Sequence, residues 1–450
     1  MLEVFDFYLE EDLDEAFFKF EIEVWQTLVH VCRRWRSIVF GSPRRLELRL
    51  VCGAETPARD TLDVWPSLPL IIRDDILPTE YVDDIIAALK RSDRVVKIDL
   101  FNTDGLELEN VLAAMQVPFL ELTYLRLHSF EGMVSVLPDS FLGGSAPRLE
   151  YLWLERIPFP GLSKLLLSAT HLVTLRLENI PHSGYISPEV MVTTLSTLTS
   201  LEYLSLAFES PLSRPDWENR RLPPPTRSVL PVLTTFEFKG VCEYLEDVVT
   251  RIDSPRLNKL YITMFNQIVF DTPQFIQFIT RSQMLDTLEK ALIVFEDDNA
   301  RVKLSPQTTG KDEEIQLMIP CRKLDWQVSS MEQVCALCLP SLSTLEDLYV
   351  YDEPRSPPGW RDNIENTLWL ELLQPFTGVK NLYLSEKFAS HIIPALQELT
   401  GSGTTEVLPT LQNIFLEELQ PSRTVQAGIQ QFAAMRRVTS HPIAVSLWET

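Results

Sequence analysis

The sequence has little of what several classes of protein require. Six cysteines among 450 residues are too few for a disulfide framework, so a reducing compartment is the simple expectation. No apolar run approaches the length of about 18 residues that a membrane-spanning helix needs. Positive charge is scarce as well, because 40 Lys and Arg residues stand against 63 Asp and Glu and leave a net charge of −23. We therefore expect neither nucleic acid nor an anionic membrane surface as a partner, since both attract clustered Lys and Arg.

The first residues, Met1 to Val4, carry no basic segment of the kind that opens a secretory signal. Together with the sparse cysteines, this predicts a cytoplasmic or nuclear protein. The sequence does not distinguish these two compartments.

Motifs of catalysis and of cofactor binding are also missing. The chain has no GxSxG, GxxxxGK[ST], GxGxxG or HExxH pattern. Cys335 and Cys338 form a CxxC, but they come late in a helical pattern and not at a helix N-terminus, where a thiol pKa is depressed. We expect both to pack in a core, and we expect no catalytic residue, no metal site and no cofactor.

What the sequence does contain is a six-residue motif that recurs along most of the chain. The copy at 149–154 reads Leu-Glu-Tyr-Leu-Trp-Leu, with apolar residues at its first, fourth and sixth positions. This pattern suits a short strand that points its fourth and sixth side chains into a core. With weaker candidates near Leu288 and Ile315, the mean spacing is about 29 residues, within the range of leucine-rich repeats. The other clear copies begin at 122, 172, 201 and 379, and weaker ones begin at Val95, Leu233, Leu257, Leu345 and Leu411.

The segments between the copies predict helices. Apolar residues follow a helical spacing in 81–91, and Ser187-Pro188 and Thr272-Pro273 are each typical of a helix start. The expected fold class is therefore α/β: a leucine-rich-repeat solenoid over 46–450, with a curved parallel sheet and the helices outside. Atypical first strands are expected at 46–50 and 68–72, further helices at 366–373, 392–399 and 425–432, and irregular loops at 209–232, 296–314 and 352–363.

Alternate positions of the repeated strands are expected to point away from the core and to form columns on the concave face, since neighbouring strands lie about 4.8 Å apart. Tyr, Trp and Arg predominate there, and these types carry most binding energy at protein interfaces. The alternative is that the rings only stabilise the sheet through cross-strand pairs. The candidate target-binding residues are Tyr124, Arg126, Tyr151, Trp153, Arg176, Tyr203, Tyr261, Tyr349, Tyr383 and Phe415. We expect replacement of Tyr151 and Trp153 by alanine to remove target binding and to leave the thermal midpoint almost unchanged.

Residues 1–45 differ from the repeats and predict short helices, one of them over 25–40 and ended by Gly41-Ser42-Pro43. The string Val31-Cys-Arg-Arg-Trp-Arg36, followed by Ser42-Pro43-Arg-Arg-Leu46, resembles the second half of an F-box in fungal, basidiomycete-type F-box/leucine-rich-repeat proteins. Val4 to Tyr8 resembles the end of the first F-box helix. With the repeats, the resemblance covers essentially the whole chain.

The resemblance implies a substrate-receptor subunit of a Skp–cullin–F-box ubiquitin ligase, an intracellular protein without catalytic residues of its own. Its partners would be a Skp-type adaptor, a cullin scaffold and a target protein of unknown identity. Packing of the helices against the solenoid is the alternative role for the adaptor-binding positions. Those implied positions are Phe5, Leu28, Val31, Cys32, Trp35 and Ile38.

One feature departs from the family. F-boxes usually open with a Leu-Pro pair before the first helix, and this sequence begins inside that helix. A second interpretation therefore stays open, in which the chain is a non-catalytic repeat scaffold whose F-box no longer binds the adaptor.

Overall fold

The computed structural model shows two compact units. Unit 1 comprises Met1–Ile186 and Thr193–Leu201, and unit 2 comprises Ser187–Val192 and Glu202–Thr450. The described residues are 29–41, 48–53, 58, 62–63, 65–74, 82–103, 105–129, 135–215, 226–267, 269–282, 288–306, 313–339, 342–352, 364–398, 407–417, 423–438 and 442–448. At 74, within 102–107 and at 386, 398, 423–424, 435 and 438, the backbone alone is described.

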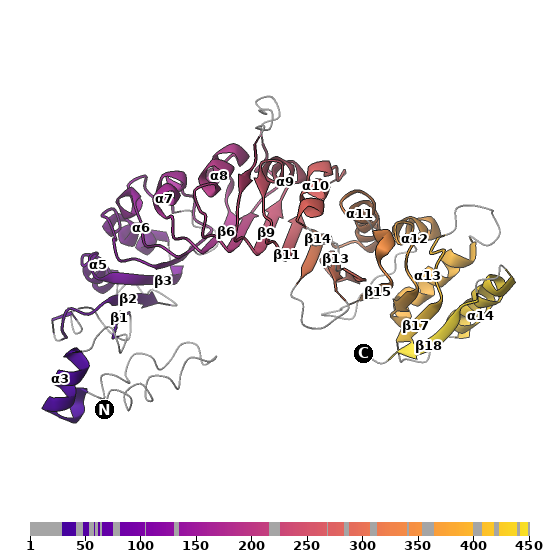
Figure 1. The fold of residues 1–450 in the computed structure, drawn as a ribbon, viewed down its shortest axis with the longest axis horizontal. Coiled ribbons are helices and arrows are strands. Elements are labelled where there is room, and N and C mark those ends of the chain that lie inside the picture. The colour runs from indigo at the N-terminus through magenta and orange to yellow at the C-terminus, as the bar shows by residue number, and fades with distance from the viewer. Residues whose placement is uncertain are drawn as a thin grey trace. The chain divides into compact units, whose positions relative to one another are not determined.

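Unit 1 is a parallel sheet whose strands are neighbours in chain order, with helices on one side (Figure 1). The strands are β1 (Leu50–Cys52), β2 (Leu70–Asp74), β3 (Val95–Thr103), β4 (Tyr124–Ser129), β5 (Tyr151–Glu155) and β6 (Thr174–Ile180). The helices are α3 (Arg33–Gly41), α5 (Val82–Leu89), α6 (Gly105–Ala114), η2 (Phe141–Gly144), α7 (Leu162–Ser168) and η3 (His182–Gly184), and α8 (Pro188–Leu195) has residues in both units.

Unit 2 repeats this arrangement with one interruption. Its sheet runs in the order β7 (Tyr203–Phe208), β9 (Thr235–Gly240), β11 (Lys259–Met264), β14 (Glu314–Pro320), β13 (Asn299–Ser305), β12 (Lys290–Phe295), β15 (Asp347–Asp352), β16 (Asn381–Leu384), β17 (Asn413–Glu417) and β18 (Ala444–Trp448). A separate pair is formed by β8 (Ser228–Val229) and β10 (Ile252–Asp253). The helices are α9 (Cys242–Val249), α10 (Pro273–Arg281), α11 (Leu324–Leu337), η6 (Leu342–Thr344), α12 (Asn366–Leu373), α13 (Glu386–Glu398) and α14 (Arg423–Val438).

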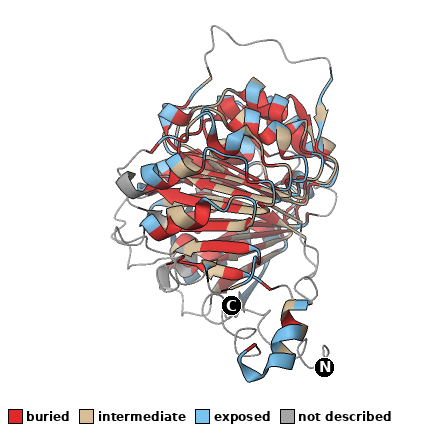
Figure 2. Cartoon of the chain, turned by 90° about the vertical axis from the view of Figure 1, so that its left-hand side faces the viewer, coloured by how far each residue is buried: buried red, intermediate tan, exposed pale blue. Residues whose placement is uncertain are grey.

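The repeated motif is the source of the core in both units. Each copy after Val95 gives a strand that begins two residues into the motif, as at Leu149 and β5. Leu149, Leu152 and Leu154, at positions one, four and six, are buried. Full burial of such a side chain stabilises a fold by roughly 1.5–3 kcal/mol, so the repeated leucines are a main source of stability. Figure 2 shows buried residues along the strands and exposed ones on the outer turns of the helices. The predicted α/β repeat solenoid is confirmed within each unit.

The prediction of an irregular loop over 296–314 is wrong. This tract contains β13, which pairs antiparallel with β12 on one side and with β14 on the other. Its charged side chains are paired across strands: Arg301 Nη1 lies 2.7 Å from Glu296 Oε1, and Lys303 Nζ lies 2.8 Å from Glu314 Oε2. The sheet is thus mostly parallel and not wholly so.

The other predicted loops are described only in part. Residues 216–225 of the loop at 209–232 and 353–363 of the loop at 352–363 lie outside the described residues, and 228–229 form β8. The predicted boundary at residue 45 also lies outside them. The first strands start later than predicted, at Leu50 and Leu70.

The predicted helix starts differ in how they are capped. At α8 the Ser187 hydroxyl accepts the backbone N–H of Val190 at 3.4 Å, as expected of an N-cap. At α10 the Thr272 side chain makes no capping hydrogen bond, and Glu246 of α9 takes this role. Within the predicted helix at 25–40, residues 29–31 are helical, Cys32 is not, and α3 begins at Arg33.

Candidate functional site

The side of each sheet away from the helices, here called the open face, carries the predicted target-binding residues. In unit 1 the strands β4, β5 and β6 alternate between buried and half-buried residues. The register places Tyr124, Tyr151 and Thr174 in one row across the strands, and Arg126, Trp153 and Arg176 in the next. Parallel in-register strands therefore stack side chains that are about 25 residues apart in the sequence.

The first row is an aromatic stack. The rings of Tyr124 and Tyr151 lie 4.3 Å apart, with 4° between their planes. Lys97 Nζ lies 4.2 Å from the centre of the Tyr124 ring. Burial, and then the nearby Asp99 carboxylate, raise the pKa of Tyr124, and burial raises the pKa of Tyr151. Both phenols therefore stay neutral and can donate or accept hydrogen bonds.

The second row alternates cations and rings. The guanidinium carbon of Arg126 lies 3.9 Å from the centre of Trp153 and 4.6 Å from the centre of Phe101. The corresponding distance from Arg176 to Trp153 is 4.5 Å, so two guanidinium groups flank one indole. Each such contact contributes roughly 0.5–1 kcal/mol at exposed sites and more where water is excluded. Trp153 thus orients both arginines on the open face.

Carboxylates balance these two arginines. Arg126 Nη1 lies 3.8 Å from Asp99 Oδ1, and Arg176 donates a hydrogen bond of 2.7 Å to Glu178 Oε1. Arg126 and Arg176 remain partly exposed, with 20% and 29% of their side chains accessible. The rows therefore present oriented N–H donors without a large excess of positive charge.

A third row forms a polar network at the ends of the strands. His128 stacks on Phe101 at 4.4 Å, and its Nε2 lies 3.1 Å from Arg156 Nη1 and 3.6 Å from Glu155 Oε1. Asn179 Nδ2 donates to the same Glu155 oxygen at 3.0 Å. Burial lowers the pKa of His128, Glu155 opposes that change, and Arg156 and Arg126 add to it. The imidazole is therefore neutral near pH 7.

Two residues next to this network adopt left-handed backbone conformations. Arg156 and Asn179 follow Glu155 and Glu178, with φ of 58° and 49°. Such conformations are uncommon for residues other than glycine. Arg156 directly follows the last residue of β5, and Asn179 is the next-to-last residue of β6.

The open face of unit 2 carries a second aromatic stack. Tyr383 stacks on Tyr349 at 4.0 Å and on Phe415 at 4.5 Å. Lys290 Nζ lies 4.0 Å from the centre of Tyr349. Trp448 of β18 makes edge contacts with Tyr349 at 5.7 Å and with Tyr383 at 5.5 Å. Residues of this chain thus already pack against this stack.

Beside it runs a ladder of polar side chains. Asn381 Nδ2 donates to Asp347 Oδ1 at 2.6 Å, and Asn413 Nδ2 donates to Asn381 Oδ1 at 2.7 Å. These cross-strand pairs give the unit 2 stack a structural role whatever else it does.

The structure therefore divides the predicted target-binding residues. Tyr124, Arg126, Tyr151, Trp153 and Arg176 form one cluster in unit 1, and Tyr349, Tyr383 and Phe415 form another in unit 2. Tyr203 lies opposite Thr235, and Tyr261 lies opposite Glu237 and Gln316. The register partners of these two tyrosines on these strands are thus not aromatic.

The positions implied for adaptor binding are described only in part. Phe5 and Leu28 lie outside the described residues. Val31 and Cys32 are exposed, the former with 59% of its surface accessible, and Trp35 and Ile38 are half-buried. These residues thus leave apolar surface accessible on the helical segment before β1.

Two residues of that segment outside the implied adaptor-binding set are buried. Val29 and Val39 are buried, and the rings of His30 and Phe40 make edge contacts with Trp65. Trp65 lies 25 residues beyond Phe40, so the sequence alone does not reveal these two ring contacts.

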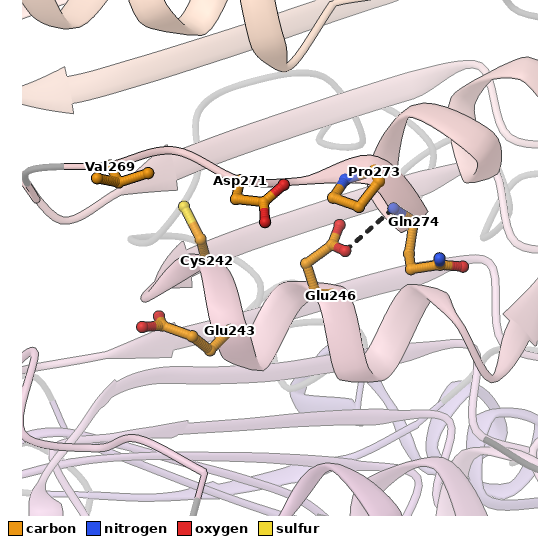
Figure 3. Close-up of a pocket in the computed structure, with 7 residues that line it drawn as sticks. All are labelled: Cys242, Glu243, Glu246, Val269, Asp271, Pro273 and Gln274. Carbon is orange, nitrogen blue, oxygen red and sulfur yellow. Dashed lines mark hydrogen bonds between the residues drawn. The ribbon is translucent and has the colours of Figure 1, made fainter. Parts of the chain in front are cut away.

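The helix side of unit 2 has a cavity of about 440 Å³ between α9 and the start of α10 (Figure 3). Glu246 accepts hydrogen bonds from the backbone N–H groups of Gln274 at 3.0 Å and Phe275 at 2.7 Å. Burial raises the pKa of Cys242, whose Sγ lies 3.2 Å from Met264 Sδ. The described residues contain no group of three or more side chains able to hold a metal ion. The lining residues are Cys242, Glu243, Glu246, Val269, Asp271, Pro273 and Gln274.

The CxxC cysteines lie inside the protein, as the sequence predicts. Cys335 in α11 and Cys338 at its end are free and buried. Burial raises the pKa of Cys338 to about 11 and raises that of Cys335 as well. Both thiols therefore stay protonated near pH 7, the form that is a poor nucleophile.

Comparison with known proteins adds little. No protein-family model matches the chain, and no curated protein matches it. A similar solved structure is the leucine-rich repeat-containing protein LegL7 from Legionella pneumophila, which is 11% identical. The match covers 86% of this chain and 97% of LegL7, with a TM-score of 0.28. The fold assignment rests on the strands and registers described above.

No helix within the described residues is long and apolar enough to cross a bilayer.

Proposed function

We propose that the protein binds a partner protein on the open face of unit 1. The observation that carries this proposal is the cluster of Tyr124, Tyr151, Arg126, Trp153 and Arg176, stacked in two rows and only half-buried. Tyr, Trp and Arg are the side chains that dominate the energetics of protein interfaces. Because stacking already restricts their rotamers, a partner that binds them loses less side-chain entropy.

A finer proposal concerns the role of this binding. We propose that the chain is the substrate receptor of a Skp–cullin–F-box ubiquitin ligase, with the open face holding the target. The support is the resemblance of 31–46 to an F-box, together with the exposure of Val31 and Cys32. In this role the chain contributes by proximity: it raises the effective concentration of the target beside the ubiquitin-charged enzyme.

A non-catalytic scaffold without adaptor binding is the second candidate. The observation that favours it is the packing of the F-box-like segment within the chain, where Val29 and Val39 are buried and the rings of His30 and Phe40 contact Trp65. The two candidates share the open face and differ only in the adaptor contact.

Adaptor binding is therefore the experiment that separates them. The purified chain is mixed with a Skp adaptor, and complex formation is measured by calorimetry. The receptor proposal predicts a one-to-one complex that Val31→Asp weakens at least tenfold. Leu167→Asp is the matched control, because Leu167 on α7 is a similarly exposed apolar residue, with 52% of its surface accessible. Failure of the unaltered chain to bind would favour the scaffold.

A further inference from the structure

Strand β18 is unusual among the strands of unit 2 because its inward side chains are not covered. It pairs in parallel with β17, so that Val445 and Leu447 lie opposite Ile414 and Leu416. Ile414 and Leu416 are 0% and 4% exposed, whereas Val445 and Leu447 are 42% and 61% exposed. β18 therefore lacks much of the apolar burial that holds the other strands in place.

Within the described residues, Ile443 directly before β18 is buried, and two interactions of the strand itself stand out. One is the backbone ladder to β17 (Figure 1). The other is the indole of Trp448, which packs on the open face against the edges of Tyr349 and Tyr383 at 5.7 and 5.5 Å. The buried Nε1 of Trp448 has no hydrogen-bond acceptor among the described residues, which weakens this anchor.

The composition of β18 is that of a strand able to pair with another chain. Its sequence, Ala-Val-Ser-Leu-Trp, contains no charge, no proline and no glycine. Edge strands of soluble proteins commonly carry charged residues or proline, which oppose pairing with other chains. In the described part of the chain, β18 is the last strand of its sheet. Its backbone and side chains thus show what kind of segment the β17 edge accepts.

We propose that the edge of β17, together with the rings of Tyr349 and Tyr383, is a binding site for an extended segment of a partner protein, and that β18 is the occupant supplied by this chain. The partner segment would pair in parallel with β17, with backbone hydrogen bonds that supply affinity. It carries uncharged residues at its first four positions and an aromatic residue at the fifth, where Trp448 lies. This site is in unit 2 and does not depend on the partner proposed for unit 1.

The aromatic residue gives the site its specificity. Backbone pairing accepts almost any sequence, but the fifth side chain must make edge contacts with both tyrosines, as Trp448 does. Aromatic pairs in this geometry add roughly 0.5–1.5 kcal/mol beyond area burial. A segment without this ring is therefore expected to bind much more weakly.

A fluorescent peptide with the sequence of residues 442–450 is the probe for this site. It is titrated into the full chain and into the Trp448→Ala variant, and anisotropy is measured. We expect binding to the variant to be at least tenfold tighter than to the unaltered chain, because β18 then competes less well. The same peptide with alanine in place of its Trp is expected to bind neither the unaltered chain nor the Trp448→Ala variant. Equally tight binding of the alanine-substituted peptide would overturn the proposal. So would failure of the unsubstituted peptide to bind the Trp448→Ala variant.

Hydrogen exchange of the unaltered chain is the second measurement, and it applies even if the variant fails to fold. The amides of 445–447 are expected to exchange at least tenfold faster than those of β16, because β18 opens locally. Equal protection of β18 and β16, or loss of the fold of unit 2 in Trp448→Ala, would show that β18 is an integral part of the sheet. A Tyr151→Ala/Trp153→Ala variant is expected to leave both results unchanged, which separates this site from that of unit 1.

Discussion

Trp153 shows how one residue can link stability and binding. Its indole lies between the guanidinium groups of Arg126 and Arg176. Tyr151, the neighbouring residue on the same face of β5, stacks on Tyr124. A side chain at such a position orders its neighbours and is itself available to a partner. The binding that we propose for the open face would therefore be coupled to the stability of the sheet at this residue.

The double substitution Tyr151→Ala/Trp153→Ala tests this coupling. We expect it to abolish partner binding and also to lower the free energy of unfolding by about 2 kcal/mol, from one lost aromatic stack and two lost cation–π contacts. The sequence alone predicts almost no change in the thermal midpoint, because it does not reveal the two cation–π contacts of Trp153. Urea unfolding and a binding assay measure the two effects. An unchanged stability would contradict the energetic role given to the stack.

His128 gives a pH dependence whose sign follows from its environment. Burial holds its pKa below the ordinary value of about 6.5. The unfolded chain therefore binds a proton in a pH range where the folded chain does not. The contribution of His128 to the free energy of unfolding is therefore fully present at a pH above the ordinary pKa of histidine. It is lost as the pH falls from that pKa toward the lower pKa of the folded state.

The comparison of the unaltered chain with His128→Gln isolates this effect. Between pH 7.5 and 5.5, we expect the free energy of unfolding of the unaltered chain to fall more steeply than that of the variant. Glu155, Arg156 and Arg126 face the imidazole and remain in both proteins, so their contribution largely cancels. Parallel pH profiles from denaturant titrations would mean that His128 does not titrate differently on folding.

At the scale of elements, the start of α10 depends on a side chain from another helix. Glu246 of α9 is 6% exposed and accepts two backbone N–H groups of α10, which otherwise have no partner within the helix. A carboxylate there also interacts favourably with the helix dipole. This contact fastens two successive helices of unit 2 to each other.

Removal of this carboxylate is expected to be costly. Glu246→Ala should lower the free energy of unfolding by about 3 kcal/mol, because two charge-assisted hydrogen bonds are lost and the N–H group of Phe275 stays buried. Glu243→Ala is the control, since Glu243 lines the same cavity and makes no capping bond to α10 within the described residues. Similar losses in the two variants, measured by urea unfolding, would contradict the capping role.

Elements with a repeated apolar motif could be predicted from the sequence, and those defined by long-range partners could not. The strand at 151–155 follows from Leu149, Leu152 and Leu154 alone. β13 was missed because its charges suggested a solvated loop, although Ala300, Val302 and Leu304 alternate as in a strand. Arg301 and Lys303 occupy the partly exposed positions between them and pair with Glu296 and Glu314, which the sequence does not reveal.

At the scale of the whole molecule, the sequence predicted which side chains lie on the open face better than it predicted how they group into clusters. It located the rows of Tyr, Trp and Arg, since their positions follow from the strand period. It could not separate the unit 1 cluster from the unit 2 stack, because the cover supplied by Trp448 depends on the position of β18. Nor could it reveal the contacts of His30 and Phe40 with Trp65, which lies far along the chain from both.

Site-specific photocrosslinking tests the central claim that the open face of unit 1 binds a partner protein. A photoreactive residue replaces Thr174, which is next to Tyr151 in register and outside the stacks, and in a second protein it replaces the exposed Leu167 on α7. We expect the photoreactive residue at position 174 to form a discrete crosslink with a partner protein. This crosslink should be lost when Trp153 is also replaced by alanine, and position 167 should form none. The same adducts from both positions, or adducts only from 167, would contradict the account.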